Sequence, residues 1–112
     1  MGSKANGSSH WMLERATSIA LVPLTFWFIY SILSFSGPAH VDFLVWLKNP
    51  TNAGILTVTI LTAYHHAALG LHVIIDDYVS TPATNRFMNC AVTGAFLLMA
   101  IASIVSIITI VF

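Results

Sequence analysis

Three long stretches with almost no charge constrain the fold of this chain more than any other feature. Residues 16–35 and 87–112 contain no Asp, Glu, Lys, Arg or His, and residues 53–75 are uncharged apart from three histidines. At a rise of about 1.5 Å per residue, a helix of about 20 residues spans the roughly 30 Å hydrocarbon core of a bilayer. The sequence therefore predicts an all-α integral membrane protein with three transmembrane helices, at about residues 16–36, 52–79 and 86–112.

Composition and charge exclude most other classes of protein. Hydrophobic residues make up 57% of the 112 residues and charged residues only 7%, whereas about 25% charged residues is usual for a soluble domain. The net charge is zero, so nothing indicates a nucleic-acid partner. The single cysteine, Cys90, excludes an internal disulfide and a Cys-based zinc or iron–sulfur site. We expect a flexible cytoplasmic N-terminal segment over residues 1–14 and a single three-helix membrane-anchor domain over residues 15–112.

The connections between the predicted spans have clear local signals. Gly37-Pro38 ends the first span, and Asn49-Pro50-Thr51 is a typical helix start. Between them, residues 39–48 mix apolar and polar side chains, which predicts a short segment in the membrane interface. Thr81-Pro82 ends the second span, and we expect Thr84-Asn85-Arg86 to turn the chain into the third.

The few basic residues indicate an orientation in the membrane. Lys4 and Arg15 precede the first span and Arg86 follows the second, whereas Lys48 alone lies on the other side. Because cytoplasmic loops carry an excess of Lys and Arg, this distribution favours an N-terminus in the cytoplasm. The 76–78 end of the second span then also faces the cytoplasm.

Histidines within the second span are the first candidates for a functional site, because ionisable groups at membrane depth are costly and usually functional. At about 100° per residue, two stripes run along this helix. The first consists of His66, Gly70, Val73 and Asp77. The second consists of His65, Leu69, His72 and Asp76.

The first stripe is suited to a flat ligand. A neutral imidazole is a good ligand for haem iron, and Gly70 lies one turn from His66, where a side chain would collide with a porphyrin plane. The alternative is that His66 only forms a hydrogen bond to a neighbouring helix. His65 and His72 are interpreted as structural residues or as residues that contact the ligand without binding the metal. The alternative is that they are two ligands along one helix, each facing its own haem.

Asp77-Tyr78 closes the second span at the membrane boundary. A phenol and a carboxylate can form hydrogen bonds to a quinone carbonyl and relay protons to it. The alternative is that this pair only marks the headgroup region, where tyrosine is common. Spacing alone favours the alternative.

These residues resemble a known family. His66-x-x-x-Gly70 followed by Asp77-Tyr78, together with Arg15-Ala16-Thr17 at the start of the first span, is similar to the small hydrophobic membrane-anchor subunit of succinate dehydrogenase, succinate:quinone oxidoreductase. The chain length and the three-helix plan are similar too, and the resemblance is greatest to alphaproteobacterial members.

The resemblance implies more than the spacing does. It implies a haem b shared with a second membrane-anchor subunit of the cytochrome b type, with His66 as the axial ligand from this chain. Tyr78 would bind ubiquinone with Asp77 beside it, and Arg15 would lie near the haem propionates or the quinone. The other implied partners are an iron–sulfur subunit, a flavoprotein subunit and the lipid bilayer, in a bacterial inner membrane rather than a mitochondrial one.

Three other functions compete with this interpretation of the sequence. A fumarate reductase anchor would run the same chemistry in the opposite direction. A structural membrane adaptor would have no cofactor. A transporter is disfavoured, because histidines are the only ionisable groups at mid-membrane depth. In none of these interpretations does this chain carry out succinate chemistry itself, since it has no means of binding a flavin or an iron–sulfur cluster.

Overall fold

The computed structural model describes residues 4–112, with side chains described at Ser9 and from Trp11 onward. It contains four α-helices: α1 Lys4–Leu33, α2 Ala39–Leu47, α3 Pro50–Tyr78 and α4 Pro82–Val111. Three of them are long and apolar enough to cross a membrane, over Trp11–Leu33, Pro50–Tyr78 and Pro82–Val111. The predicted all-α fold with three transmembrane helices is therefore confirmed.

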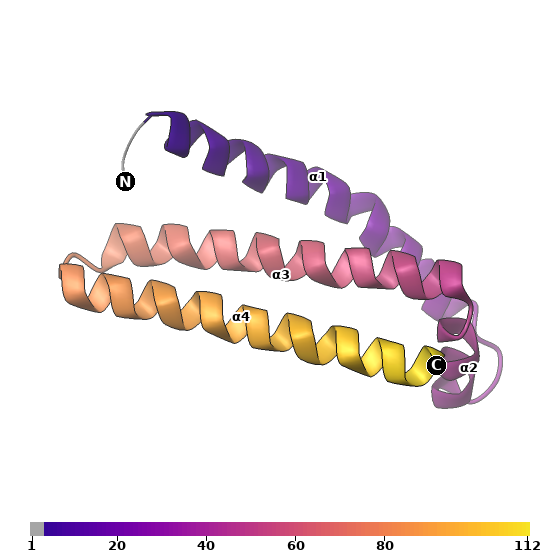
Figure 1. Ribbon diagram of the computed structural model, residues 1–112. Coiled ribbons are helices and arrows are strands. Elements are labelled where there is room, and N and C mark those ends of the chain that lie inside the picture. The colour runs from indigo at the N-terminus through magenta and orange to yellow at the C-terminus, as the bar shows by residue number, and fades with distance from the viewer. Residues whose placement is uncertain (1–3) are drawn as a thin grey trace.

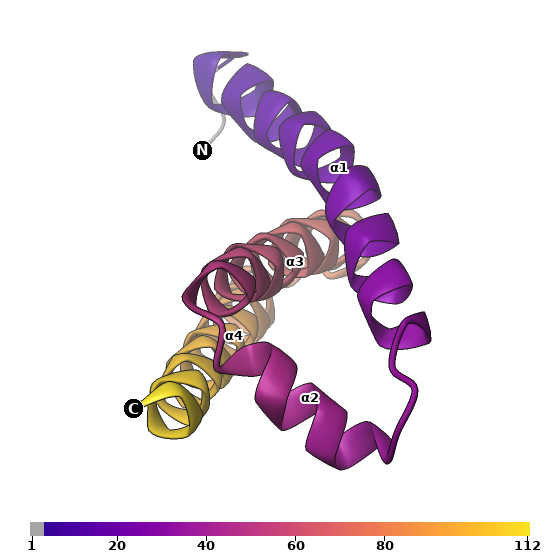
Figure 2. The same ribbon diagram turned by 90° about the vertical axis from the view of Figure 1, so that its right-hand side faces the viewer.

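Helix α3 is the central element of the fold. It packs against α1 on one side and α4 on the other, and α1 diverges from α3 towards its own N-terminal end (Figure 1). The beginning of α1 and the turn between α3 and α4 lie at one end of the molecule, whereas α2 and the C-terminus lie at the other (Figure 1). Seen along the helices, α1 and α4 lie on different sides of α3, and the three helices do not form a flat layer (Figure 2).

The starts of α3 and α4 follow from proline at the first helical position, where its missing N–H costs nothing. Asn49 caps α3, because its side-chain oxygen accepts a hydrogen bond from the backbone N–H of Thr51 at 2.9 Å. Helix α4 begins at Pro82, directly after Thr81. The turn therefore occupies residues 79–81, and the expectation that residues 84–86 form it is wrong: they lie in the first turns of α4.

The segment between the first two spans is a helix rather than a loop. Helix α2 packs against both α3 and α4, and its Trp46 is the centre of an aromatic cluster. The rings of this cluster lie 5.3–6.4 Å from Trp46, centroid to centroid: Trp27, Phe28, Phe35 and Phe43. Beside it lies a small core of Leu47, Ala53, Leu56 and Ile107. Packing is thus concentrated at the α2 end of the molecule.

Helix α1 begins at Lys4, within the N-terminal segment that the sequence predicts to be flexible. Residues 1–3 of that segment lie outside the described residues. At its other end α1 stops at Leu33, a few residues earlier than predicted. The following turn is stabilised by the backbone N–H of Gly37, which donates a 2.8 Å hydrogen bond to the Asp42 carboxylate.

Candidate functional site

His66 lies on the face of α3 that meets α1. Its side chain is half-buried, and its Nδ1 atom is 2.9 Å from the hydroxyl oxygen of Thr17 on α1. This is a hydrogen bond between two membrane-spanning helices, and it fixes the plane of the imidazole. Among the described residues the Nε2 atom of His66 has no hydrogen-bond partner. The Nδ1 atom of His66 is therefore held by Thr17, and its Nε2 atom is available to a ligand.

Gly70 leaves open space beside this histidine. It follows His66 by one helical turn on the same face of α3. A Cβ atom added at Gly70 would meet no heavy atom outside the local helix within 4 Å. The space beside His66 into which a side chain of residue 70 would project is therefore open in this chain, although α1 contacts the same face at Thr17.

His72 is held differently, because both of its ring nitrogens have partners on α4. Its Nδ1 atom lies 2.6 Å from the side-chain oxygen of Asn89, and its Nε2 atom lies 3.2 Å from the hydroxyl of Thr93. Asn89 in turn donates to the carboxylate of Asp76 at 3.1 Å. These contacts make His72 part of a polar connection between α3 and α4, with no nitrogen left for a metal.

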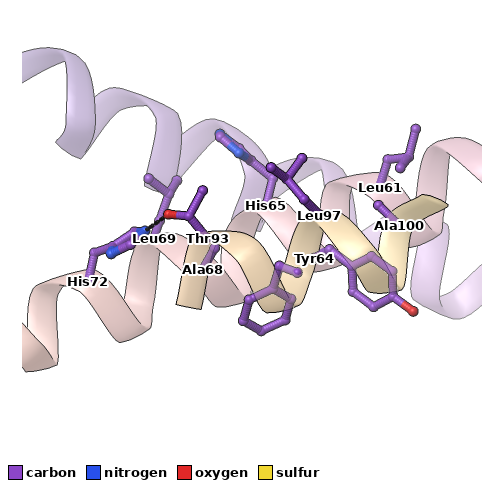
Figure 3. A pocket seen from close by; sticks show the side chains of 10 residues that line it. Leu61, Tyr64, His65, Ala68, Leu69, His72, Thr93, Leu97 and Ala100 are labelled. Carbon is purple, nitrogen blue, oxygen red and sulfur yellow. Dashed lines mark hydrogen bonds between the residues drawn. The ribbon is translucent and has the colours of Figure 1, made fainter. Parts of the chain in front are cut away.

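A cavity of about 310 Å³ lies between α3 and α4, on the side of α3 that carries His72 (Figure 3). His65 is exposed at this cavity and His72 lies at one end of it (Figure 3). Most of the remaining lining is apolar: Leu61, Tyr64, Ala68, Leu69, Phe96, Leu97 and Ala100. Tyr64 is also tied to α4, since its hydroxyl lies 2.9 Å from that of Ser103. The second stripe of α3 is thus the contact surface for α4.

Arg15 lies on α1, two residues before Thr17. Its guanidinium carbon is 5.1 Å from the ring centroid of Trp11, at a distance that favours a cation–π interaction. Both residues line a cavity of about 280 Å³ together with Glu14 and Ser18. Arg15 is therefore a cationic side chain near the level of His66 along the bundle, beside a hollow on the surface of α1.

Asp77 and Tyr78 are exposed at the end of α3, and Tyr78 is its last residue. Tyr78 is 83% exposed. Twelve residues of helix separate it from His66, which corresponds to about 18 Å along the axis. The fold thus brings together Thr17, His66 and Gly70, and it keeps Asp77 and Tyr78 apart from them. Within the described part of the chain there is no group of three His, Cys, Asp or Glu side chains able to hold a metal ion.

The partners of the histidines are not predictable from the motif alone. The sequence draws attention to Thr17 only as part of the Arg15-Ala16-Thr17 resemblance, and it gives Asn89 and Thr93 no prominence. A signal for Asn89 does exist, because it follows Asn85 by four residues near the start of a helix that is otherwise largely apolar. Two amides on one face of such a helix indicate a polar contact with a neighbouring helix.

Comparison with known proteins gives one consistent family. The family described as "Succinate dehydrogenase/Fumarate reductase transmembrane subunit" matches residues 1–109. The succinate dehydrogenase hydrophobic membrane anchor subunit of Rickettsia bellii is 38% identical over 107 residues, which cover 95% of this chain and 85% of the relative. The corresponding subunit of Rickettsia typhi is 30% identical over 106 residues, covering 94% and 84%. The succinate dehydrogenase membrane anchor subunit of Reclinomonas americana is 28% identical over 101 residues, covering 87% and 78%.

No solved structure is significantly similar to the chain. The family match and the Rickettsia relatives confirm the resemblance inferred from the motif, including its alphaproteobacterial character. Three membrane-length helices and a match over nearly the whole length lead to one conclusion. The chain belongs to the family of succinate dehydrogenase and fumarate reductase transmembrane subunits.

Proposed function

We propose that this chain is the hydrophobic membrane anchor of succinate:quinone oxidoreductase, respiratory complex II, in a bacterial inner membrane. In this proposal His66 would be this chain's ligand to the iron of a haem b shared with a second anchor subunit. Asp77, Tyr78 and Arg15 contribute to the site of ubiquinone reduction. The observation that carries the proposal is the state of His66, which has one nitrogen held by Thr17 and the other available.

The residues of this chain fit a shared haem. A histidine that holds haem iron requires a neutral imidazole nitrogen with a free lone pair, and His66 has a nitrogen without a hydrogen-bond partner among the described residues. Gly70 supplies open space on the same face. A haem b bound there would supply one-electron chemistry. The second ligand would come from the partner anchor, because the remaining histidines of α3 face α4 instead.

The exposed end of α3 suits the quinone reaction. Reduction of ubiquinone to ubiquinol takes two electrons and two protons, and the electrons would come from the iron–sulfur subunit. The phenol of Tyr78 would donate a hydrogen bond to a quinone carbonyl, and the carboxylate of Asp77 would pass protons towards it from the aqueous side. Exposure of both side chains leaves them available to a ligand at a subunit boundary.

The proposed orientation in the membrane brings the soluble subunits to the end of the molecule where Asp77 and Tyr78 lie. The first half of α1, which contains Arg15, and the first turns of α4, which contain Arg86, lie towards the end of the molecule where α3 turns into α4 (Figure 1). Under the positive-inside rule this end is cytoplasmic. The iron–sulfur subunit would therefore dock near Asp77 and Tyr78, with the flavoprotein subunit bound behind it.

Expression of the chain with and without its partner anchor tests the shared haem. We expect a low-spin haem spectrum with two histidine ligands only when both anchors are present, because this chain supplies one ligand. The measurement is a reduced-minus-oxidised optical spectrum of the purified membrane protein. A monodisperse monomer of this chain alone with that spectrum would show that the haem is not shared.

Tyr78→Phe tests the quinone role separately. It removes a hydroxyl from a side chain that is exposed in this chain, so the fold of α3 should be unaffected. Loss of a hydrogen bond in a dry site costs about 1–3 kcal/mol, which corresponds to roughly a tenfold or greater fall in quinone reduction. Succinate oxidation by a soluble dye should persist, because it does not use this site.

Tyr30→Phe is the matched control for this variant. Tyr30 is also strongly exposed, at 75%. It lies near the C-terminal end of α1, close to Leu33, and that end of α1 is at the opposite end of the molecule from the last turn of α3 (Figure 1). The same substitution there should leave quinone kinetics unchanged. Wild-type quinone kinetics in Tyr78→Phe would instead assign Tyr78 to the interfacial tyrosine belt.

A further inference from the structure

The hydroxyl of Thr17 has more acceptors around it than it has hydrogens. Its oxygen lies 2.8 Å from the backbone carbonyl of Leu13, 3.0 Å from that of Glu14 and 2.9 Å from Nδ1 of His66. A threonine hydroxyl has one hydrogen and two lone pairs. It can therefore donate towards the carbonyl oxygens or towards the imidazole, and the choice determines the tautomer of His66.

The two carbonyl oxygens decide this choice. A carbonyl oxygen has no hydrogen to donate, so its contact with Thr17 is a hydrogen bond only if the hydroxyl donates. Donation to the carbonyl four residues earlier is also the usual arrangement for threonine within a helix. The imidazole, in contrast, can supply a hydrogen itself. All three contacts are satisfied when the hydroxyl donates to the helix backbone and Nδ1–H of His66 donates to the hydroxyl oxygen.

From this geometry we infer that Thr17 is the positioning residue of the haem ligand: it holds the hydrogen of His66 on Nδ1 and so presents Nε2 with a free lone pair. The inference rests on the proposed function of His66 and deepens it. If Thr17 donated to Nδ1 instead, the hydrogen would move to Nε2 and block ligation. A metal-bound histidine usually donates its other ring N–H to a neighbouring acceptor, which fixes the ring and raises its basicity.

The other α3 histidines show that this arrangement is selective. His72 also has a partner at Nδ1, but its Nε2 atom is close to the hydroxyl of Thr93, so no nitrogen is left. His65 has no hydrogen-bond partner among the described residues, so nothing fixes its tautomer or its ring plane. Of these three histidines, only His66 combines a held Nδ1 with an available Nε2. Helix α1 thus determines how a ligand on α3 is presented.

Thr17→Val tests the inference in the co-expressed complex, because valine keeps the shape of the side chain and removes its oxygen. We expect haem affinity to fall by about 10- to 100-fold, the usual effect of losing such a supporting contact. The midpoint potential of the haem that remains should rise, because a less basic imidazole stabilises the oxidised iron less. Thr17→Ser should restore both properties, since serine keeps the hydroxyl.

Ser18→Ala is the matched control. The Ser18 hydroxyl donates to the carbonyl of Glu14 at 2.9 Å, much as Thr17 does, but it forms no hydrogen bond to a histidine of the described chain. This variant should keep the wild-type haem content and potential. If Thr17→Val does not assemble, Thr17→Ala replaces it with the same expected result, because the smaller side chain cannot overfill the site.

The measurements are the haem-to-protein ratio and a redox titration of each assembled complex, with His66→Ala alongside. Wild-type haem content and potential in the assembled Thr17→Val or Thr17→Ala complex would overturn the positioning role. If His66→Ala loses its haem in the same series, only that role is wrong and the proposed function stands. If His66→Ala keeps the wild-type haem, the proposed function itself is wrong.

Discussion

His66→Ala is expected to abolish the low-spin haem signal of the assembled complex. The substitution removes the imidazole whose Nδ1 atom lies 2.9 Å from the hydroxyl oxygen of Thr17, and the first stripe contains no other histidine. Loss of the hydrogen bond between α1 and α3 costs only about 1 kcal/mol, so the complex should still assemble. The measurement is a reduced-minus-oxidised spectrum on complex whose subunit content has been checked.

His65→Ala is the matched control, because it changes the adjacent histidine. Adjacent residues differ by about 100° around a helix, and His65 is exposed at the cavity between α3 and α4 rather than facing α1. The haem signal should therefore remain. A lost signal in His65→Ala together with a retained signal in His66→Ala would reverse the assignment and show that the haem binds on the α4 side of α3.

Much of the fold could be predicted because a bilayer imposes simple requirements. A stretch without charge that is long enough to cross the hydrocarbon core has little alternative to a helix, so α3 and α4 match the predicted spans to within four residues. The turn between α3 and α4 could not be placed in the same way, because a proline such as Pro82 can follow the end of one helix or begin the next. In this chain Pro82 begins α4, so the turn lies before it. Helix α2 is not recognisable as a helix in the sequence, because nine residues are too few for a periodic pattern to stand out.

The candidate site was predictable only in part, for a physical reason. Spacing along one helix shows which residues share a face, and it correctly separated His66 from His65 and His72. It does not show which neighbouring helix each face meets, because α1 and α4 are mostly apolar and few of their side chains mark a contact surface in the sequence. The pairing of His66 with Thr17, and of His72 with Asn89, depends on rotation and register between helices.

Gly70→Leu is expected to cause a loss of haem similar to that in His66→Ala, although the ligand itself is unchanged. In this chain a Cβ atom added at Gly70 meets no heavy atom outside the local helix within 4 Å, and leucine is a better helix former than glycine by about 1 kcal/mol. The variant should therefore be at least as stable as the wild type within α3. Its only expected defect is that the leucine occupies the space that a porphyrin plane needs beside His66.

Gly54→Leu makes this test specific. Gly54 lies on the same helix, and a Cβ atom added there also meets nothing within 4 Å. It is sixteen residues from Gly70, which at about 100° per residue places it on a nearly opposite face. Haem content should be lost in Gly70→Leu and kept in Gly54→Leu, as measured by the haem-to-protein ratio of assembled complex. Equal haem content in the two variants would mean that the open face beside His66 does not receive the macrocycle, even if His66 remains the ligand.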